Sequence, residues 1–440
     1  MSLPADQGTE AGAGTAIAVT GVGLVTPAGA DEHSFWERLC SGHSTARRCE
    51  ELAGLPVDFA CPVDGIDLDE AVGGRSVWRM ARFVKLALVA ARQAVADAGL
   101  DPARWDGSRV GVVLGVGVGG VSVLVDNAAK LAASGPEAVS PLLVPMMIPN
   151  AAAGEVAIAL KAGGPSLAPA TACASGATAV AVARDLLLGG SCDVVVAGGA
   201  ESVLTPLVVT AFARMGALST RTGDPAGASR PFAADRDGFV IGEGAAMLVL
   251  ERESAARARG RRPRALLTGA GSSTDAHHPT APAPDGYGAQ RAVQAALDQA
   301  GWAPSDVDHI NAHGTSTPLN DAMEIRPHLP ALPAPAAGDR PQGGRRAHPG
   351  RGGRDRGGGH RPDAGTLRHP ADRQPGRVPR RLPARLRDEG APSATGRDGT
   401  QPLLRLRRPQ RRPRLPTRLI HRGISGRRGC PRRSLIVTLL

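Results

Sequence analysis

The chain has 440 residues, of which 42% are hydrophobic and 2% aromatic, so an aromatic-rich β-sandwich is disfavoured and helices packed closely on sheets are favoured. Its formal net charge of +11 is unevenly distributed, because residues 326–440 contain 28 Arg, no Lys and 7 acidic residues, whereas residues 1–325 contain 24 basic and 34 acidic residues. The six cysteines show no paired spacing and no run reaches the roughly 18 apolar residues of a membrane span, so we expect a cytoplasmic protein with reduced thiols and no membrane segment.

Short apolar runs alternate with helical patterns between residues 16 and 312. The predicted strands are 16–25, 109–114, 193–197, 245–251, 265–269 and 307–312, and the predicted helices are 77–98, 176–188 and 288–300. Continuous apolar strands alternating with helices are typical of an α/β fold with a mostly parallel sheet covered on both faces. We expect two such halves, residues 1–255 and 256–325, followed by the tail 326–440.

A glycine-rich segment follows the predicted strand 109–114. Gly115, Gly117 and Gly120 match the pattern G-x-G-x-x-G, which binds dinucleotides when it joins a strand to a helix. This pattern leaves an NAD(P)-binding enzyme open as an alternative function.

The sharpest local feature is Thr171-Ala-Cys173-Ala-Ser-Gly176, between an extended run and a helix of small residues. Unpaired N–H groups and the positive end of a helix dipole favour the thiolate form of a cysteine at a helix N-terminus. The small neighbours leave room for an acyl chain. Cys173 is therefore a candidate nucleophile, whereas Cys192 beside an apolar strand fits a structural role.

A second feature is Asn311-Ala-His313-Gly-Thr315-Ser-Thr317-Pro318, directly after a predicted strand. Active sites of α/β folds lie at the carboxyl ends of strands. Together with a helix-capping cysteine upstream, His313 is a candidate electrophile or base.

Several longer blocks occur in a recognisable order. They are TACASG around Cys173, VVVAGGAE at 194–201, ALSTR at 217–221, SRPFAADRDGFVIGEGA at 229–245 and NAHGTSTPLND at 311–321. From about Ile17 to Ile325 the chain resembles the β-ketoacyl-acyl-carrier-protein synthases, which are type II ketosynthases of the thiolase superfamily.

The resemblance implies a thiolase-like αβαβα five-layer sandwich of two related halves, with the second half truncated here. It implies that Cys173 carries the acyl group and that His313 is the first histidine of a pair that promotes decarboxylation of malonyl-carrier protein. Thr315 and Thr317 match the threonines that hold pantetheine, and the loop with Thr280 matches one that contacts the pantetheine channel. The Cys173 N–H would donate to the oxyanion formed at the acyl carbonyl.

The resemblance also predicts partners. They are an acyl carrier protein and either a second copy or a related ketosynthase subunit. No metal and no cofactor are expected beyond the phosphopantetheine of the carrier protein. A chain-length factor, an inactive relative, is disfavoured because such relatives typically lack the nucleophile present here as Cys173.

Two family motifs expected after His313 are missing, namely Lys-x-x-x-Gly-His and Gly-Phe-Gly-Gly. A forward shift of one base permits the first from Gln342 onward and the second within 401–410. We therefore predict that residues 326–440 are out of frame and disordered, and that this chain is impaired as a condensing enzyme.

The Arg-rich tail also leaves a nucleic-acid-binding protein as an alternative. The lack of Lys in residues 326–440 and the two motifs hidden in the shifted frame argue against selection for that role. We expect only non-specific, salt-sensitive contact with nucleic acid.

Overall fold

The computed structural model describes residues 16–325 and 400–407. Apart from the strand at 400–407, the tail predicted to be disordered and to contact nucleic acid non-specifically lies outside the described residues. Those eight residues differ from the prediction, because they form a strand that pairs antiparallel with 266–274. The unpaired edge of a strand presents a row of N–H and C=O groups, and an extended segment can pair with them through backbone hydrogen bonds.

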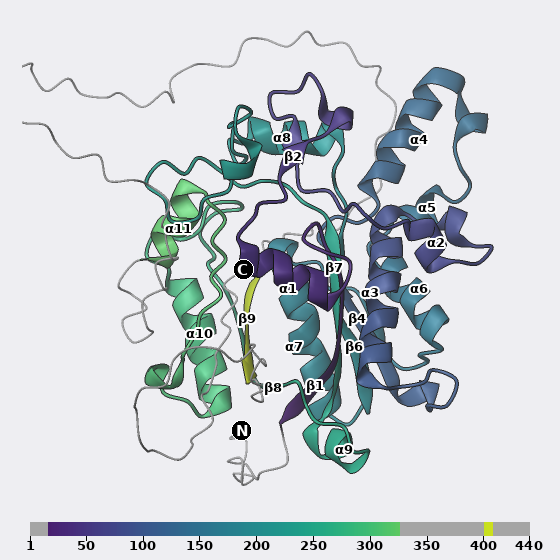
Figure 1. The fold of residues 1–440 in the computed structure, drawn as a ribbon, viewed down its shortest axis with the longest axis vertical. Helices are drawn as coiled ribbons and strands as arrows, with labels where there is room; N and C mark the ends of the chain where they lie inside the picture. Colours follow the sequence, from purple (N-terminus) through teal and green to yellow (C-terminus); the bar gives the residue numbers. More distant parts are fainter. Residues whose placement is uncertain (1–15, 326–399, 408–440) are drawn as a thin grey trace, which may run out of the picture. The chain divides into compact units, whose positions relative to one another are not determined.

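Seven described strands form one sheet in the order β5-β4-β6-β7-β1-β8-β9 (Figure 1). They are β1 Ile17–Val25, β4 Val110–Gly115, β5 Ser166–Leu167, β6 Val194–Glu201, β7 Gly244–Arg252, β8 Ala265–Thr274 and β9 Thr400–Arg407. A separate pair consists of β2 Arg47–Arg48 and β3 Phe59–Ala60. The helices are α1 Glu32–Ser41, α2 Leu68–Val72, α3 Arg82–Ala98, α4 Val121–Ser134, α5 Leu143–Met147, α6 Ala151–Leu160, α7 Ser175–Leu188, α8 Pro206–Arg214, α9 Glu253–Ala258, α10 Tyr287–Ala300 and α11 Pro318–Glu324.

The prediction of a mostly parallel sheet is wrong. Among the described strands of this sheet, only the pairs β4–β5 and β4–β6 are parallel, whereas the pairs β6–β7, β7–β1, β1–β8 and β8–β9 are antiparallel. The apolar runs are continuous because helices cover both faces of the central strands. Burial on two faces gives the same sequence pattern for either strand direction.

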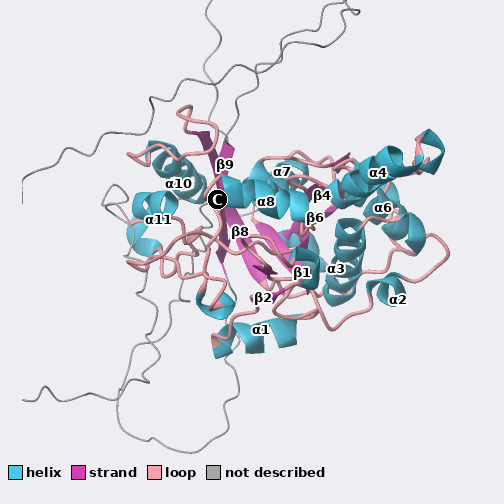
Figure 2. Cartoon of the chain, turned by 90° about the horizontal axis from the view of Figure 1, so that it is seen from above, coloured by secondary structure: helices cyan, strands magenta, loops and turns pink. Residues whose placement is uncertain are grey.

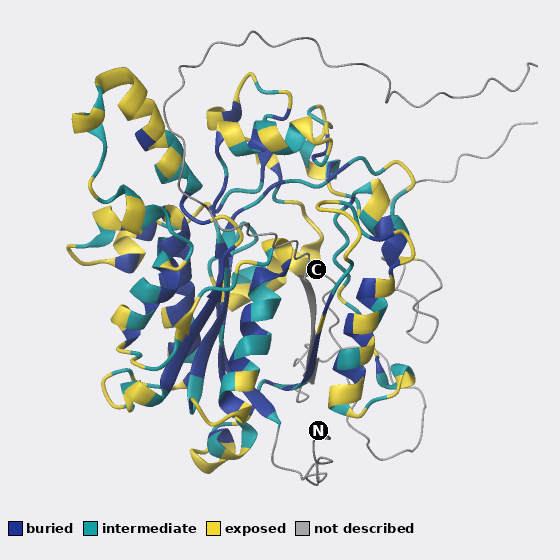
Figure 3. Cartoon of the chain, turned by 180° about the vertical axis from the view of Figure 1, so that it is seen from behind, coloured by how far each residue is buried: buried dark blue, intermediate teal, exposed yellow. Residues whose placement is uncertain are grey.

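Helices α3 and α7 cover opposite faces of the sheet, and Figure 2 shows strands between them. On β4, Val112 and Leu114 belong to the core beneath α3, whereas Val113 belongs to the core beneath α7. This alternation follows from the two-residue period of a strand. In Figure 3 these strands are buried, while α4 is largely exposed.

Helix α3 lies unusually close to β1, and two glycines make this possible. A Cβ atom on Gly21 would lie 2.0 Å from the Ala94 carbonyl oxygen, and one on Gly23 would lie 2.0 Å from the Ala90 carbonyl oxygen. Any side chain at either position would force the helix away from the strand.

Two predicted elements differ in the structure. The predicted helix 77–98 begins only at Arg82, after a 3₁₀ turn at Val77–Arg79, because Ala81 is extended and the Arg82 guanidinium is bonded to the buried Glu243 carboxylate at 2.7 and 2.8 Å. The predicted strand 307–312 is irregular, and it pairs with none of the described strands.

Candidate active site

Cys173 lies on a short 3₁₀ turn, Ala172–Ala174, that leads directly into α7. The residue before it, Ala172, has a φ of 52°, in the left-handed region that a residue with a side chain rarely adopts. Cys173 is exposed, so the residue after the strained position is accessible. A strained turn that presents an accessible nucleophile is a frequent feature of active sites.

The environment of the thiol differs from the prediction. Although the residue as a whole is exposed, desolvation by surrounding atoms raises the pKa of the Cys173 thiol, and the hydrogen bond from its own backbone N–H acts in the opposite direction. The position before α7 does not outweigh this desolvation. The free thiol is therefore protonated at neutral pH, and its activation requires a base or the approach of a substrate.

A carboxylate from α11 holds the loop that contains His313. The two oxygens of Glu324 accept hydrogen bonds from the N–H groups of His313 and Gly314, each at 2.8 Å, and Asn320 donates to the same carboxylate at 2.9 Å. Glu324 is 6% exposed. It was not singled out in the sequence, where its only signal is an acidic residue one helical turn after Asp321.

The His313 imidazole is partly buried, and burial lowers its pKa, against an opposing effect of the Asp321 carboxylate. The ring is thus neutral at pH 7. A neutral imidazole retains one N–H donor and one acceptor nitrogen, which suits either hydrogen bonding to a developing oxyanion or proton transfer.

The predicted threonines fall into two groups. The hydroxyls of Thr315 and Thr317 lie 2.9 Å apart in the loop that carries His313. Thr280 lies exposed in the loop after β8, where its N–H donates to His278 Nδ1 at 3.2 Å. Among the described residues, no hydrogen bond joins Cys173 to His313 or either residue to Thr280.

The block at 229–245 packs against the His313 loop. The N–H of Gly238 donates to the Ser316 carbonyl at 2.9 Å, and the Phe232 N–H donates to the buried Asp321 carboxylate at 2.7 Å. Arg236 donates to the carbonyl of Thr317 at 3.2 Å. These bonds explain how residues some 80 positions apart in the chain hold one loop.

The glycine-rich segment after β4 does not present a free dinucleotide site. The Val118 and Gly119 N–H groups, which would face a pyrophosphate, donate to the Glu201 carboxylate at 2.7 and 3.3 Å. A Cβ atom on Gly115 would lie 2.0 Å from the Ser175 carbonyl oxygen. The glycine therefore allows β4 to approach the start of α7, and these contacts give the NAD(P)-binding alternative no support.

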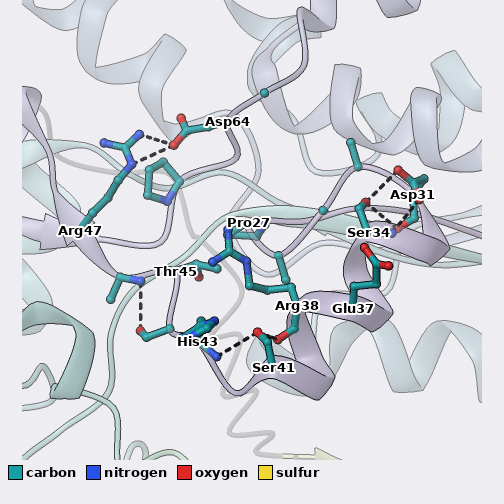
Figure 4. A pocket seen from close by; sticks show the side chains of 17 residues that line it. Pro27, Asp31, Ser34, Glu37, Arg38, Ser41, His43, Thr45, Arg47 and Asp64 are labelled. Carbon is teal, nitrogen blue, oxygen red and sulfur yellow. Dashed lines mark hydrogen bonds and ion pairs between the residues drawn. The ribbon is translucent and has the colours of Figure 1, made fainter.

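One pocket, of about 850 Å³, lies away from these residues, between α1 and the segments that follow it (Figure 4). Its lining includes Asp31, Glu37 and Arg38 from α1 and its N-cap, and the ion pair Arg47–Asp64. None of the predicted site residues lines it. None of the described helices combines the length and the hydropathy that a membrane span requires, and among the described residues no three His, Cys, Asp or Glu side chains are grouped as metal ligands.

Two family models match the chain. The β-ketoacyl synthase N-terminal domain matches residues 15–256, and the β-ketoacyl synthase C-terminal domain matches residues 264–338. The first match alone covers more than half of the chain and includes Cys173, whereas the second includes His313.

Individual relatives agree with the family models. The chain is 40% identical over 312 residues to the 3-oxoacyl-[acyl-carrier-protein] synthase 2 of Staphylococcus aureus (strain COL). The aligned region covers 70% of this chain and 75% of that protein. The solved ishigamide ketosynthase/chain length factor is 32% identical, with a TM-score of 0.68 over 73% of this chain and 79% of that one.

A second solved structure contains a carrier protein. It is AntDE:AntF, a type II polyketide synthase acyl-carrier protein in complex with its ketosynthase bound to the hexaketide, with 30% identity and a TM-score of 0.65 over 71% of this chain and 76% of that one. The chain therefore belongs to the β-ketoacyl synthase family of 3-oxoacyl-acyl-carrier-protein synthases, acyltransferases that catalyse the condensation step of fatty acid and polyketide biosynthesis.

Proposed function

We propose that Cys173 is the acyl acceptor of this ketosynthase. Its sulfur attacks the thioester carbonyl of an acyl-carrier protein, the new C–S bond forms, and the pantetheine thiol leaves with a proton. The observation that carries the proposal is the accessible thiol on a strained turn at the start of α7. The Cys173 N–H at that turn is a donor suited to the oxyanion of the tetrahedral intermediate.

His313 is proposed to act in the second half-reaction. Malonyl-carrier protein loses CO₂, and an imidazole N–H stabilises the enolate oxygen that develops. The carbanion then attacks the acyl-cysteine, so that a C–C bond forms, the C–S bond breaks and the Cys173 thiolate is released. The lowered pKa of His313 supports this role, because a neutral ring donates one hydrogen bond without carrying a permanent charge.

Thr315, Thr317 and Thr280 are proposed to bind the pantetheine arm. Thr315 and Thr317 support this by their neighbouring hydroxyls in the His313 loop, and Thr280 by its exposure in the loop after β8. The architecture we propose is the αβαβα five-layer sandwich, with the first half at 1–255, a partial second half at 256–325 and an out-of-frame tail at 326–440.

The proposed partners are an acyl carrier protein and a second ketosynthase-like subunit, either a copy of this chain or a relative. Exposed apolar side chains near the β5 edge of the sheet support a subunit contact there. They include Leu167 on β5, Ile158 on α6 and Val144 on α5, which are 43%, 70% and 61% exposed. Such a surface is costly to leave in water.

The test separates acylation from condensation. The purified chain is incubated with acyl-carrier protein and then malonyl-carrier protein, and the protein mass and products are measured. We expect an acyl adduct on Cys173 that Cys173→Ala abolishes and Cys192→Ala retains, with condensation strongly impaired. An adduct that persists in Cys173→Ala would refute the nucleophile, and normal turnover would refute the impairment.

The tail has its own test, which is the DNA sequence around the codons for Ile325 and Arg326. We expect that deleting one base there restores both missing motifs and condensation. A corrected chain that acylates Cys173 but still does not condense would count against the frame-shift explanation alone.

A further inference from the structure

The turn before Cys173 is held by one buried side chain that the proposed chemistry does not use. Ser175, the first residue of α7, is 4% exposed. Its hydroxyl accepts a hydrogen bond from the Thr171 N–H at 2.9 Å and donates one to the Ala172 carbonyl at 2.7 Å. A single oxygen thus joins the two residues that immediately precede the nucleophile.

This arrangement matters because Ala172 is the strained residue. A left-handed φ is unfavourable for alanine and persists only where neighbouring groups hold it. The hydrogen bonds to Ser175 hold the backbone on both sides of that φ angle. One involves the N–H of Thr171, before the angle, and the other involves the carbonyl of Ala172, after it. The Ser175 carbonyl, in turn, lies against Gly115 of β4, so the brace is fixed to the sheet.

We propose that Ser175 is a positioning residue for the reaction at Cys173: its hydroxyl holds Ala172 in the left-handed conformation that places the Cys173 thiol and N–H for attack. The inference rests on the proposed role of Cys173 as acyl acceptor. Ser175 itself touches no substrate and transfers no proton in this scheme.

The test is a double-mutant cycle with Ser175→Ala, Ala172→Gly and the combined variant. Two rates are measured for each: alkylation of Cys173 by iodoacetamide as a function of pH, and acyl transfer from an acyl-carrier protein followed by mass. Ser175→Ala is expected to slow both at neutral pH by roughly tenfold to a hundredfold, the range typical of a misplaced reacting group.

Glycine adopts the left-handed region without a side-chain penalty, so Ala172→Gly is expected to restore several-fold of the rate in the Ser175→Ala background. A purely structural role of Ser175 would not produce this rescue. The matched control is Ser34→Ala at the start of α1, where the hydroxyl also makes two hydrogen bonds, to the carbonyl and the carboxylate of Asp31; its rates should stay within about twofold of the wild-type chain.

The outcomes are distinct. The proposal is overturned if folded Ser175→Ala reacts at the wild-type rate, or if Ala172→Gly gives it no rescue. If the wild-type chain is alkylated normally but takes no acyl group, the proposed function fails, whereas the alkylation rates still decide the role of Ser175. Thermal unfolding of each variant identifies those that are not folded.

Discussion

In two parts of the molecule, a pair of glycines allows a strand to pack closely against a helix. The first unit consists of β1 and α3, and the second unit consists of β8 and α10. Gly21 and Gly23 let β1 approach the Ala94 and Ala90 carbonyls of α3. Similarly, a Cβ atom on Gly269 or Gly271 of β8 would lie 2.3 or 2.0 Å from the Ala296 or Ala292 carbonyl oxygen of α10. The register irregularity falls at Thr20 in one unit and Thr268 in the other.

The two units differ in whether the threonine hydroxyl at the register irregularity has a hydrogen-bond acceptor. Thr20 Oγ1 donates at 2.5 Å to the Glu251 carboxylate on β7, the neighbour of β1. Thr268 Oγ1 is buried and has no hydrogen-bond partner in the described residues. The close packing of helix on strand is therefore set by glycines within each unit. The hydrogen-bond acceptor for a buried threonine, in contrast, comes from a strand that is distant in the sequence.

The largest effect on stability is expected from substitution of the glycines that allow this close contact. Gly23→Val would place a branched side chain against the Ala90 carbonyl and should cost about 3 kcal/mol or more of unfolding free energy. Gly271→Val should cost a comparable amount, because Gly271 approaches the Ala292 carbonyl of α10 as closely as Gly23 approaches that of Ala90. Urea unfolding of the two variants measures both losses.

The matched control is Gly154→Ala in α6, where nothing lies within 4 Å of an added Cβ atom. It should leave stability unchanged or raise it by up to about 1 kcal/mol. Equal destabilisation by Gly154→Ala and Gly23→Val would show that close approach is not the reason for the glycines.

Core truncation compares the two helices directly. Leu86 on α3 is 0% exposed and Leu297 on α10 is 2% exposed, so each change to Ala should cost about 2–5 kcal/mol. The cost should be larger for Leu86, which belongs to the larger core and leaves a cavity less able to collapse. A larger loss for Leu297→Ala in urea unfolding would contradict this ranking.

The threonine pair sharpens the difference between the units. Thr20→Val removes a donor from the buried Glu251 carboxylate and should cost about 1–3 kcal/mol, whereas Thr268→Val replaces a hydroxyl without a described partner and should be neutral or stabilising by about 1 kcal/mol. Chemical denaturation of both variants measures the contrast. Similar losses at both positions would mean that Thr268 has an acceptor that the described residues lack.

The smallest effect is expected from the ion pairs that Asp193, just before β6, makes with Arg109 and Arg252. Hydrogen bonds from Arg109 and then Arg252 lower the pKa of Asp193 from 3.8 to about 2. Because the folded-state pKa is depressed, this stabilisation is present above about pH 4 and is lost as the pH falls from 4 toward 2. The Asp193 side chain is 45% exposed, so solvent screening limits it to less than about 1 kcal/mol.

The check on Asp193 is the difference in urea-unfolding free energy between pH 7 and pH 3. Asp193→Asn should show a smaller difference than the wild-type chain. An unchanged difference would mean that other carboxylates account for the acid sensitivity of this fold.

Local patterns in the sequence were sufficient for much of the fold and site. Apolar runs located β1, β4, β6, β7 and β8, and the TACASG block correctly predicted that Cys173 precedes a helix of small residues. These features depend on burial and on the local geometry of the chain. The spacing of hydrophobic residues and the positions of small residues indicate both directly. Ordered motif blocks then identified the family, because several long matches in sequence order are specific.

Other features were decided only by tertiary structure. The strand directions, the late start of α3 at Arg82 and the clamp of Glu324 on the His313 loop depend on residues far apart in the chain or on pairing between strands. The raised pKa of the Cys173 thiol likewise reflects the atoms packed around the sulfur rather than its place at a helix N-terminus. A one-dimensional pattern reports which residues are buried, whereas the neighbours that satisfy a hydrogen bond, hold a charge or desolvate a sulfur are set by the folded chain.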